Sequence, residues 1–358
     1  MDHQPFDFGC DLYKAADQID QRSHLVGAGT AVRILDDDAF YGLTVVAFTS
    51  QFNRGKLADL VSLLSGRNFE TKTYEEDVAA DAFARLDQGV RQFISETHFK
   101  RYTMIVRSAG FVASKMIRSQ NVLNFGYVLY LKLRAAGVSS ELIGRYVPRW
   151  LVLAILTDRY TGSAETEMDS DVHQLASRDF KEFLEANKAG KLSDTFWTVE
   201  LPQKLQTSGT SSPYFWVFIA AQVKAKDKGF LSRDITVQDL VTHLGDIHHV
   251  FPRDYLKKQG LSRAQYNQIA NYVYTQEEIN IKVGNKAPAE YMGTVRDQCE
   301  GGPLVYGAID NVADLQHNLA ANATPDGIFA MTYAHYPDFL AERRMLMAAK
   351  IRGYYHGL

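Results

Sequence analysis

The run Ile-His-His-Val-Phe at residues 247–251 constrains the fold most, because it is a β-type run in a chain whose other apolar residues recur mainly at helical spacing. Side chains on a strand alternate between its two faces, so the adjacent His248 and His249 are expected to point in different directions. Pro252 follows at once and lacks the N–H that would continue strand pairing. The run therefore predicts a short strand that presents one imidazole on each face.

The asparagines that follow this strand suggest what the imidazoles do. Cleavage of a phosphodiester needs an activated water and relief of negative charge, and one imidazole with one divalent ion can supply both. One histidine could bind the ion while the other faces the water, and the carbonyl oxygen of Asn280 offers a second metal ligand. Oxygen ligands and substrate phosphates favour Mg²⁺, and an imidazole ligand also admits Mn²⁺, Ni²⁺ or Zn²⁺.

The arrangement resembles the HNH, or ββα-metal, nuclease family. The family motif opens with Asp/His-His-hydrophobic-x-Pro, carries an Asn in the middle, and closes with Asn or His; residues 248–252, HHVFP, match the opening. The spacing from Asn271 to Asn280 is similar to that in the HNH domain of RNA-guided CRISPR nucleases. The resemblance implies that His248 and Asn280 bind the metal, that His249 is the general base, and that Asn271 braces the loop that orients it. Many members have Asp where this chain has His248, whereas colicin-type nucleases also have His-His.

Three further residues belong to the predicted site. The resemblance places Lys286 near the scissile phosphate. Asp246 lies two residues before His248 and would share its face, where it either orients the imidazole or only opens the strand. Asn285 is a second candidate for such an orienting role. A zinc site built from His243 with both strand histidines is an alternative, with poor spacing and no cysteine ligand.

A wider resemblance covers most of the chain. Residues 48–69, FTSQFNRGKLADLVSLLSGRNF, and the helical middle are similar to the C-terminal part of domain-of-unknown-function family 262, which includes GmrSD-like modification-dependent restriction enzymes. Members carry an N-terminal domain with an Asp-Gly-Gln-Gln-Arg-type motif associated with nucleotide use, and this sequence lacks that motif. The resemblance implies a C-terminal half, a truncated chain or one subunit of a split system, with a nucleotide-binding domain or subunit as partner.

The predicted fold class is mainly α, with a helical domain followed by a small ββα-metal HNH nuclease domain and C-terminal helices. Residues 1–207 are assigned to a partner-binding, regulatory or DNA-positioning helical domain, and 208–358 to the nuclease domain, with its core at about 240–296. The Ser/Gly/Thr-rich segment 208–213 is the most linker-like. Apolar periodicity predicts helices at residues 39–64, 77–95, 102–119, 122–136, 139–160, 164–186, 288–299, 310–320 and 337–354, and a helix or strand at 214–224.

Composition indicates the cellular compartment and limits how the chain can bind DNA. The two cysteines, Cys10 and Cys299, are far apart, which favours a reducing compartment over a disulfide scaffold. No signal peptide is expected at the start, and the apolar runs are too short to span a bilayer, so a cytoplasmic protein is expected. The net charge of -3 requires that DNA contacts come from a local basic patch. The basic residues around the predicted site are Arg253, Lys257, Lys258, Arg263, Lys282, Lys286 and Arg296.

The sequence thus predicts a metal-dependent DNA endonuclease, either nicking or, as a homodimer, cutting both strands, that acts in prokaryotic anti-phage defence or modification-dependent restriction. One alternative is a non-catalytic sensor or assembly module with a degenerate HNH-like domain. Another is a metal-independent ribonuclease that uses Arg91 and His98, which match the loose Arg-x(4–6)-His pattern of HEPN ribonucleases.

Overall fold

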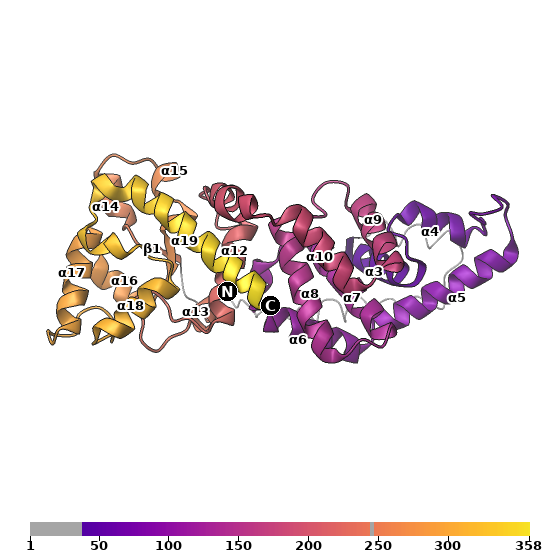
Figure 1. The fold of residues 1–358 in the computed structure, drawn as a ribbon, viewed down its shortest axis with the longest axis horizontal. Coiled ribbons are helices and arrows are strands. Elements are labelled where there is room, and N and C mark those ends of the chain that lie inside the picture. Colours follow the sequence, from indigo (N-terminus) through magenta and orange to yellow (C-terminus); the bar gives the residue numbers. More distant parts are fainter. Residues whose placement is uncertain (1–37, 244–246) are drawn as a thin grey trace. The chain divides into compact units, whose positions relative to one another are not determined.

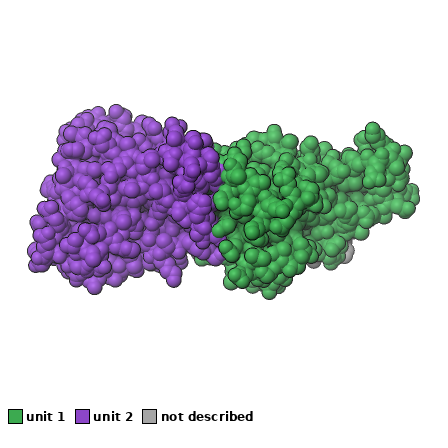
Figure 2. Space-filling model, in the orientation of Figure 1, with its two compact units in different colours: residues 1–107, 117–191 green, residues 108–116, 192–358 purple. Residues whose placement is uncertain are grey.

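A computed structural model describes residues 38–243 and 247–358 (Figure 1). The fold is mainly helical, as predicted, with one antiparallel pair of short strands among the described residues. The chain divides into two compact units (Figure 2). Among the described residues, the first consists of 38–107 and Ile117–Lys191, and the second of Ser108–Met116, 192–243 and 247–358. Residues 192–207, assigned from sequence to the helical domain, thus cluster with the second unit.

The first unit is a helical assembly in which α3 packs on α5 and α7, and α7 packs on α8. Its core is apolar and aromatic; Phe48 and Phe125 are fully buried. Ser119 caps α7 by accepting a hydrogen bond from the Val122 N–H, and Gly137, at φ +72°, follows the helix end. Its helices are α3 (Asp38–Phe52), α4 (Leu57–Leu64), α5 (Glu76–Phe93), α6 (Glu96–Ser108), α7 (Gln120–Ala135), α8 (Ser140–Leu156), α9 (Ala164–Ser177) and α10 (Phe180–Lys191).

Two of the predicted long helices are divided. The pattern at 39–64 is two helices, α3 and α4, and the pattern at 164–186 is α9 followed by α10. The prediction of one continuous helix was wrong in both places. It was also wrong at 102–119, where α6 ends at Ser108 and only the short 3₁₀ helix Ser114–Met116 follows before α7. Pro148 lies inside α8, and the helix continues through it.

The second unit is organised around the long C-terminal helix α19, which packs on α11, α12 and η4. The segment 214–224, which periodicity left open, is helical. The elements of this unit are η2 (Ser114–Met116), η3 (Phe196–Glu200), α11 (Leu201–Lys204), α12 (Pro213–Lys224), α13 (Val237–Thr242), β1 (Ile247–His249), α14 (Arg253–Lys258), α15 (Arg263–Tyr266), η4 (Ile269–Asn271), β2 (Tyr272–Tyr274), α16 (Glu277–Val283), α17 (Pro288–Cys299), α18 (Val312–Ala321), η5 (Asp326–Ala330), η6 (Tyr333–His335) and α19 (Tyr336–Gly357).

The predicted linker at 208–213 is fastened to the sheet region. The Ile269 N–H donates to the Thr207 carbonyl at 2.8 Å, and the Tyr272 hydroxyl donates to the Ser208 carbonyl at 3.2 Å. The Ser/Gly/Thr composition therefore marks an irregular strap beside η4 and β2, with α12 starting directly after it at Pro213.

Cys299, in α17, is a free thiol, and Cys10 lies outside the described residues. Across residues 38–243 and 247–358, no helix combines the length and the apolar character that crossing a membrane would require.

Candidate functional site

The two predicted histidines lie on β1, which pairs antiparallel with β2. In this register His248 is opposite Val273 and His249 is opposite Tyr272. Directly opposed side chains share a face of the sheet, and consecutive ones do not. The His249 ring stands edge-on to the Tyr272 ring, with centroids 5.0 Å apart and planes at 88°. The two imidazoles therefore leave the strand on opposite faces, with His249 on the Tyr272 face.

His249 is held by a residue that the sequence did not single out. Its Nε2 lies 3.0 Å from Oδ1 of Asn267, on the loop between α15 and η4. With this amide oxygen as acceptor, Nε2 carries the hydrogen and Nδ1 keeps the lone pair that a general base needs. The only sequence signal for Asn267 is its place in the run YNQIAN, four residues before Asn271.

Burial keeps His249 neutral. It lowers the pKa of His249 below the usual value, the hydrogen bond to Asn267 acts in the opposite direction, and the nearby charges of Arg253 and His248 lower the pKa further. A neutral imidazole at pH 7 can accept a proton, so the environment suits the base predicted from sequence.

Asn271 is fully buried, and its hydrogen bonds extend the pairing of the two strands beyond the end of β1. Its backbone carbonyl accepts from the Val250 N–H at 2.9 Å. Its Oδ1 accepts from the Phe251 N–H at 2.8 Å, and its Nδ2 donates to the Phe251 carbonyl at 3.0 Å and the Tyr266 carbonyl at 3.3 Å. The carboxamide thus ties the end of β1 to the loop that carries Asn267, which are the contacts a bracing residue would make.

A second set of buried contacts fixes the same segment from outside. The guanidinium of Arg343, fully buried in α19, donates to the carbonyls of Ala270 at 2.8 Å and Asn322 at 3.1 Å. The Tyr291 hydroxyl donates to the Val250 carbonyl at 2.8 Å. Because α17 and α19 both hold this backbone, the position of the imidazole is set by the core of the unit rather than by a surface loop.

Asn280 lies in α16, which begins three residues after β2 ends. The chain therefore has the order strand, antiparallel strand, helix, with both histidines on the first strand and Asn280 on the helix. The Asn280 side chain is half-buried and hydrogen-bonds to none of the described residues, so its carbonyl oxygen is available to a ligand. If the two side chains share one ion, an imidazole and an amide oxygen with further positions open to water would fit Mg²⁺ or Mn²⁺.

The remaining predicted residues lie around this core. The Lys286 ammonium donates to the Lys282 carbonyl at 2.7 Å and lies 5.7 Å from the centroid of the Tyr306 ring, at the C-terminal end of α16. Asn285 is exposed in the loop that follows this helix. Asp246 lies outside the described residues.

The residues of the alternative zinc site and of the alternative ribonuclease site make other contacts. In the described part of the chain, no three His, Cys, Asp or Glu side chains gather as a metal site of those residues would require. The His243 Nδ1 lies 2.8 Å from the Thr242 hydroxyl oxygen. Arg91 pairs with Asp87 on α5, whereas His98, on α6, lies 3.3 Å from the Tyr130 hydroxyl.

Comparison with known proteins adds little to this geometry. The chain is 26% identical to an uncharacterized protein of Methanocaldococcus jannaschii over 148 residues, which are 41% of this chain and 24% of the relative. It therefore spans about a quarter of that relative's length. No family model matches the sequence, and no solved structure matches it.

Proposed function

We propose that this chain is a metal-dependent DNA endonuclease of the HNH type. The observation that carries the proposal is the order β1, β2, α16 along the chain, with His248 and His249 on the first strand and Asn280 on the helix. The buried Asn271 braces the segment that joins the two strands. A prokaryotic defence or modification-dependent restriction role, with a second copy or a nucleotide-binding domain as partner, is part of the proposal on the strength of the sequence resemblance.

The protein's own residues have distinct tasks. His249 accepts a proton from the attacking water at Nδ1, because Nε2 is engaged by Asn267. Asn271 and Arg343 keep the backbone on either side of the base in place. His248 and Asn280 would hold the divalent ion, which would offset the negative charge on the phosphate and the leaving oxygen. Lys286 contributes a positive charge at the end of α16, where the substrate phosphate would approach.

Incubation of the full chain with supercoiled plasmid in Mg²⁺, Mn²⁺ or EDTA tests this function. Cleavage is expected only with a metal ion. His249→Ala should reduce the rate by about 10²–10⁴-fold, which is the usual contribution of a positioned base. His317→Ala is the matched control, since His317 is an exposed histidine on α18 that contacts none of the described site residues.

Cleavage by His249→Ala at the wild-type rate would show that the base is assigned wrongly. A folded wild-type chain that neither cuts DNA nor binds Mn²⁺ in a calorimetric titration would instead favour the non-catalytic module.

A further inference from the structure

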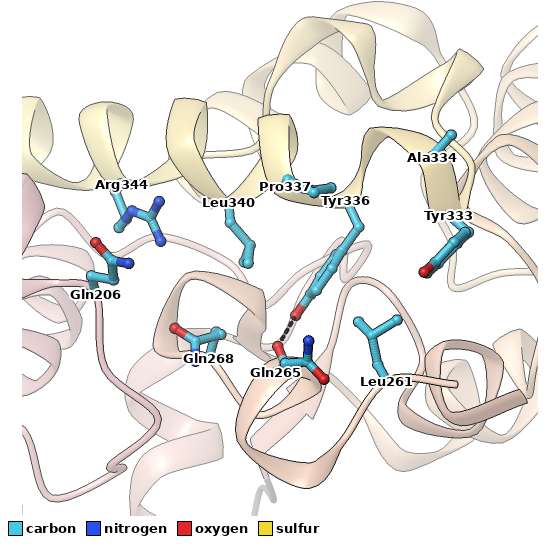
Figure 3. A pocket seen from close by; sticks show the side chains of 10 residues that line it. All are labelled: Gln206, Leu261, Gln265, Gln268, Tyr333, Ala334, Tyr336, Pro337, Leu340 and Arg344. Atoms are coloured by element: carbon cyan, nitrogen blue, oxygen red, sulfur yellow. Dashed lines mark hydrogen bonds between the residues drawn. The ribbon is translucent and has the colours of Figure 1, made fainter. Parts of the chain in front are cut away.

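A pocket of about 590 Å³ lies in the second unit, beside the loop that carries Asn267 (Figure 3). One side is formed by η6 and the first turns of α19, and the other by the segment from Leu261 to Gln268, which includes α15, with Gln206. The volume falls within the range of about 300–1,000 Å³ that is typical of small-molecule sites.

One end of the pocket holds a cation without a counter-charge. The guanidinium of Arg344 is half-buried and makes no hydrogen bond or ion pair with any residue in 38–243 or 247–358. Burial lowers the pKa of Arg344, so the surroundings disfavour the charge. Figure 3 shows Gln206 beside it, and this side chain also lacks a described partner. An anion bound here would offset the desolvation of the guanidinium and accept its planar donors.

The rest of the pocket suits a flat, partly polar group. Figure 3 shows Tyr333 and Leu261 at the end away from Arg344, with Tyr336, Pro337 and Leu340 between. Two glutamine side chains on the facing segment, Gln265 in α15 and Gln268 after it, keep hydrogen-bonding capacity. Gln265 uses Oε1 to accept from Ser262, which leaves its amide N–H groups unused, and Gln268 uses Nε2 to donate to Ala264, which leaves its oxygen unused.

Both ends of the pocket fit one kind of ligand: a phosphate-bearing group joined to a planar ring that has donors and acceptors on its edge. We propose that this pocket binds one nucleotide, with its phosphate on Arg344 and its base against Tyr333 and the glutamine amides, an inference that rests on the proposed nuclease function. Aromatic side chains and amides are the groups that accept an unpaired base. The expected ligand is therefore a nucleotide whose base is unpaired, in single-stranded DNA or extruded from a duplex.

The pocket shares a wall with the candidate active site. The Tyr336 hydroxyl lies 3.1 Å from the Gln265 carbonyl and 3.2 Å from the Tyr266 carbonyl, and the next residue, Asn267, bonds His249. A nucleotide seated here would rest on the loop that holds the general base, which gives the pocket a direct means of positioning the substrate strand.

Equilibrium binding of a fluorescent single-stranded oligonucleotide of about 12 bases, measured in EDTA, tests the pocket without cleavage. Arg344→Gln should weaken binding by about tenfold and reduce the slope of log affinity against log salt by about one. Arg352→Gln, on the same helix, is the matched control, because it removes the same charge from an exposed pair with Asp194; its affinity should stay within about twofold of wild type. Gln206→Ala should weaken binding without a change in charge. Equal affinities of the Arg344→Gln and Arg352→Gln proteins would overturn the proposal.

Titration with deoxyadenosine monophosphate separates the two sources of such a ligand. Arg344-dependent binding of the oligonucleotide supports a strand nucleotide, and Arg344-dependent binding of the mononucleotide alone supports a free one. Failure of both to bind would overturn the pocket assignment.

If plasmid cleavage persists in Arg344→Gln at the Arg352→Gln rate, the pocket fails and the nuclease stands. If binding depends on Arg344 but no metal supports cleavage, the nuclease fails and the pocket stands.

Discussion

Burial of His249 and its hydrogen bond to Asn267 act in opposite directions on the pKa of the candidate base, and burial has the larger effect. Burial lowers the pKa of His249 from its ordinary value of 6.5, so the folded protein binds this proton less readily than the unfolded chain. Because the unfolded state binds more protons there, this group makes the fold less stable as pH falls below about 6.5, and has no such effect above it. The neutral, active imidazole should persist to mildly acidic pH.

Asn267→Asp is expected to move the pH dependence of cleavage. A carboxylate against Nε2 would stabilise the imidazolium and raise the pKa of His249 by about one unit or more. The acidic limb of kcat/KM, from initial nicking rates at several pH values, should shift upward by that amount. Asn267→Ala removes the hydrogen bond and adds no charge, so its limb should not move upward. An unchanged limb in Asn267→Asp would mean that the titrating group is not His249.

At the scale of the element, the end of β1 depends on one carboxamide. Asn271 satisfies both backbone groups of Phe251 in a fully buried place. Asn271→Ala should lower the free energy of unfolding by about 3 kcal/mol, since it leaves buried donors and acceptors unpaired. Asn280→Ala, on half-buried α16, should lower it by less than about 0.5 kcal/mol while abolishing cleavage. Urea denaturation followed by circular dichroism measures both, and equal stability losses would contradict the bracing role of Asn271.

The elements that local patterns could predict are those whose cause is local. Pro288 and the following apolar spacing predict α17, and the structure has it at Pro288–Cys299. The strand at the histidines was also confirmed, although it covers only Ile247–His249 of the predicted run 247–251. The segment between α3 and α4 makes a distant contact: a Cβ at Gly55 would lie 2.3 Å from the Asp169 backbone nitrogen, 114 residues away in sequence. No local pattern contains that contact.

The same limit applies to the candidate site. The histidines and asparagines of the motif could be singled out from their spacing along the chain, and the structure places them on β1, η4 and α16. Asn267 and Arg343 could not, since their partners, His249 and Ala270, become neighbours only after β1 pairs with β2 and α19 folds back on η4. The pocket around Arg344 escaped sequence reasoning for that reason too, because three separate segments form it.

At the scale of the whole molecule, every described residue of the candidate site belongs to the second unit. A bound divalent ion stabilises the state that binds it by mass action, and the effect is largest for the segments that open locally to release it. We expect the short helix α16 to be such a segment, since it has seven residues, of which Ile279 and Val283 are buried. The first unit supplies none of the proposed ligands.

Hydrogen exchange followed by mass spectrometry should therefore separate the units. Saturating Mn²⁺ is expected to slow exchange about tenfold or more in peptides that cover β1 and α16, and to leave α3, α5 and α7 unchanged. His248→Ala should abolish the protection, whereas His317→Ala should retain it. Protection by Mn²⁺ confined to the first unit, or retained in full by His248→Ala, would place the metal elsewhere and remove the reason for pairing His248 with Asn280. Protection of β1 and α16 that depends on His248 would tie the strand and the helix to one ion, as the proposed chemistry requires.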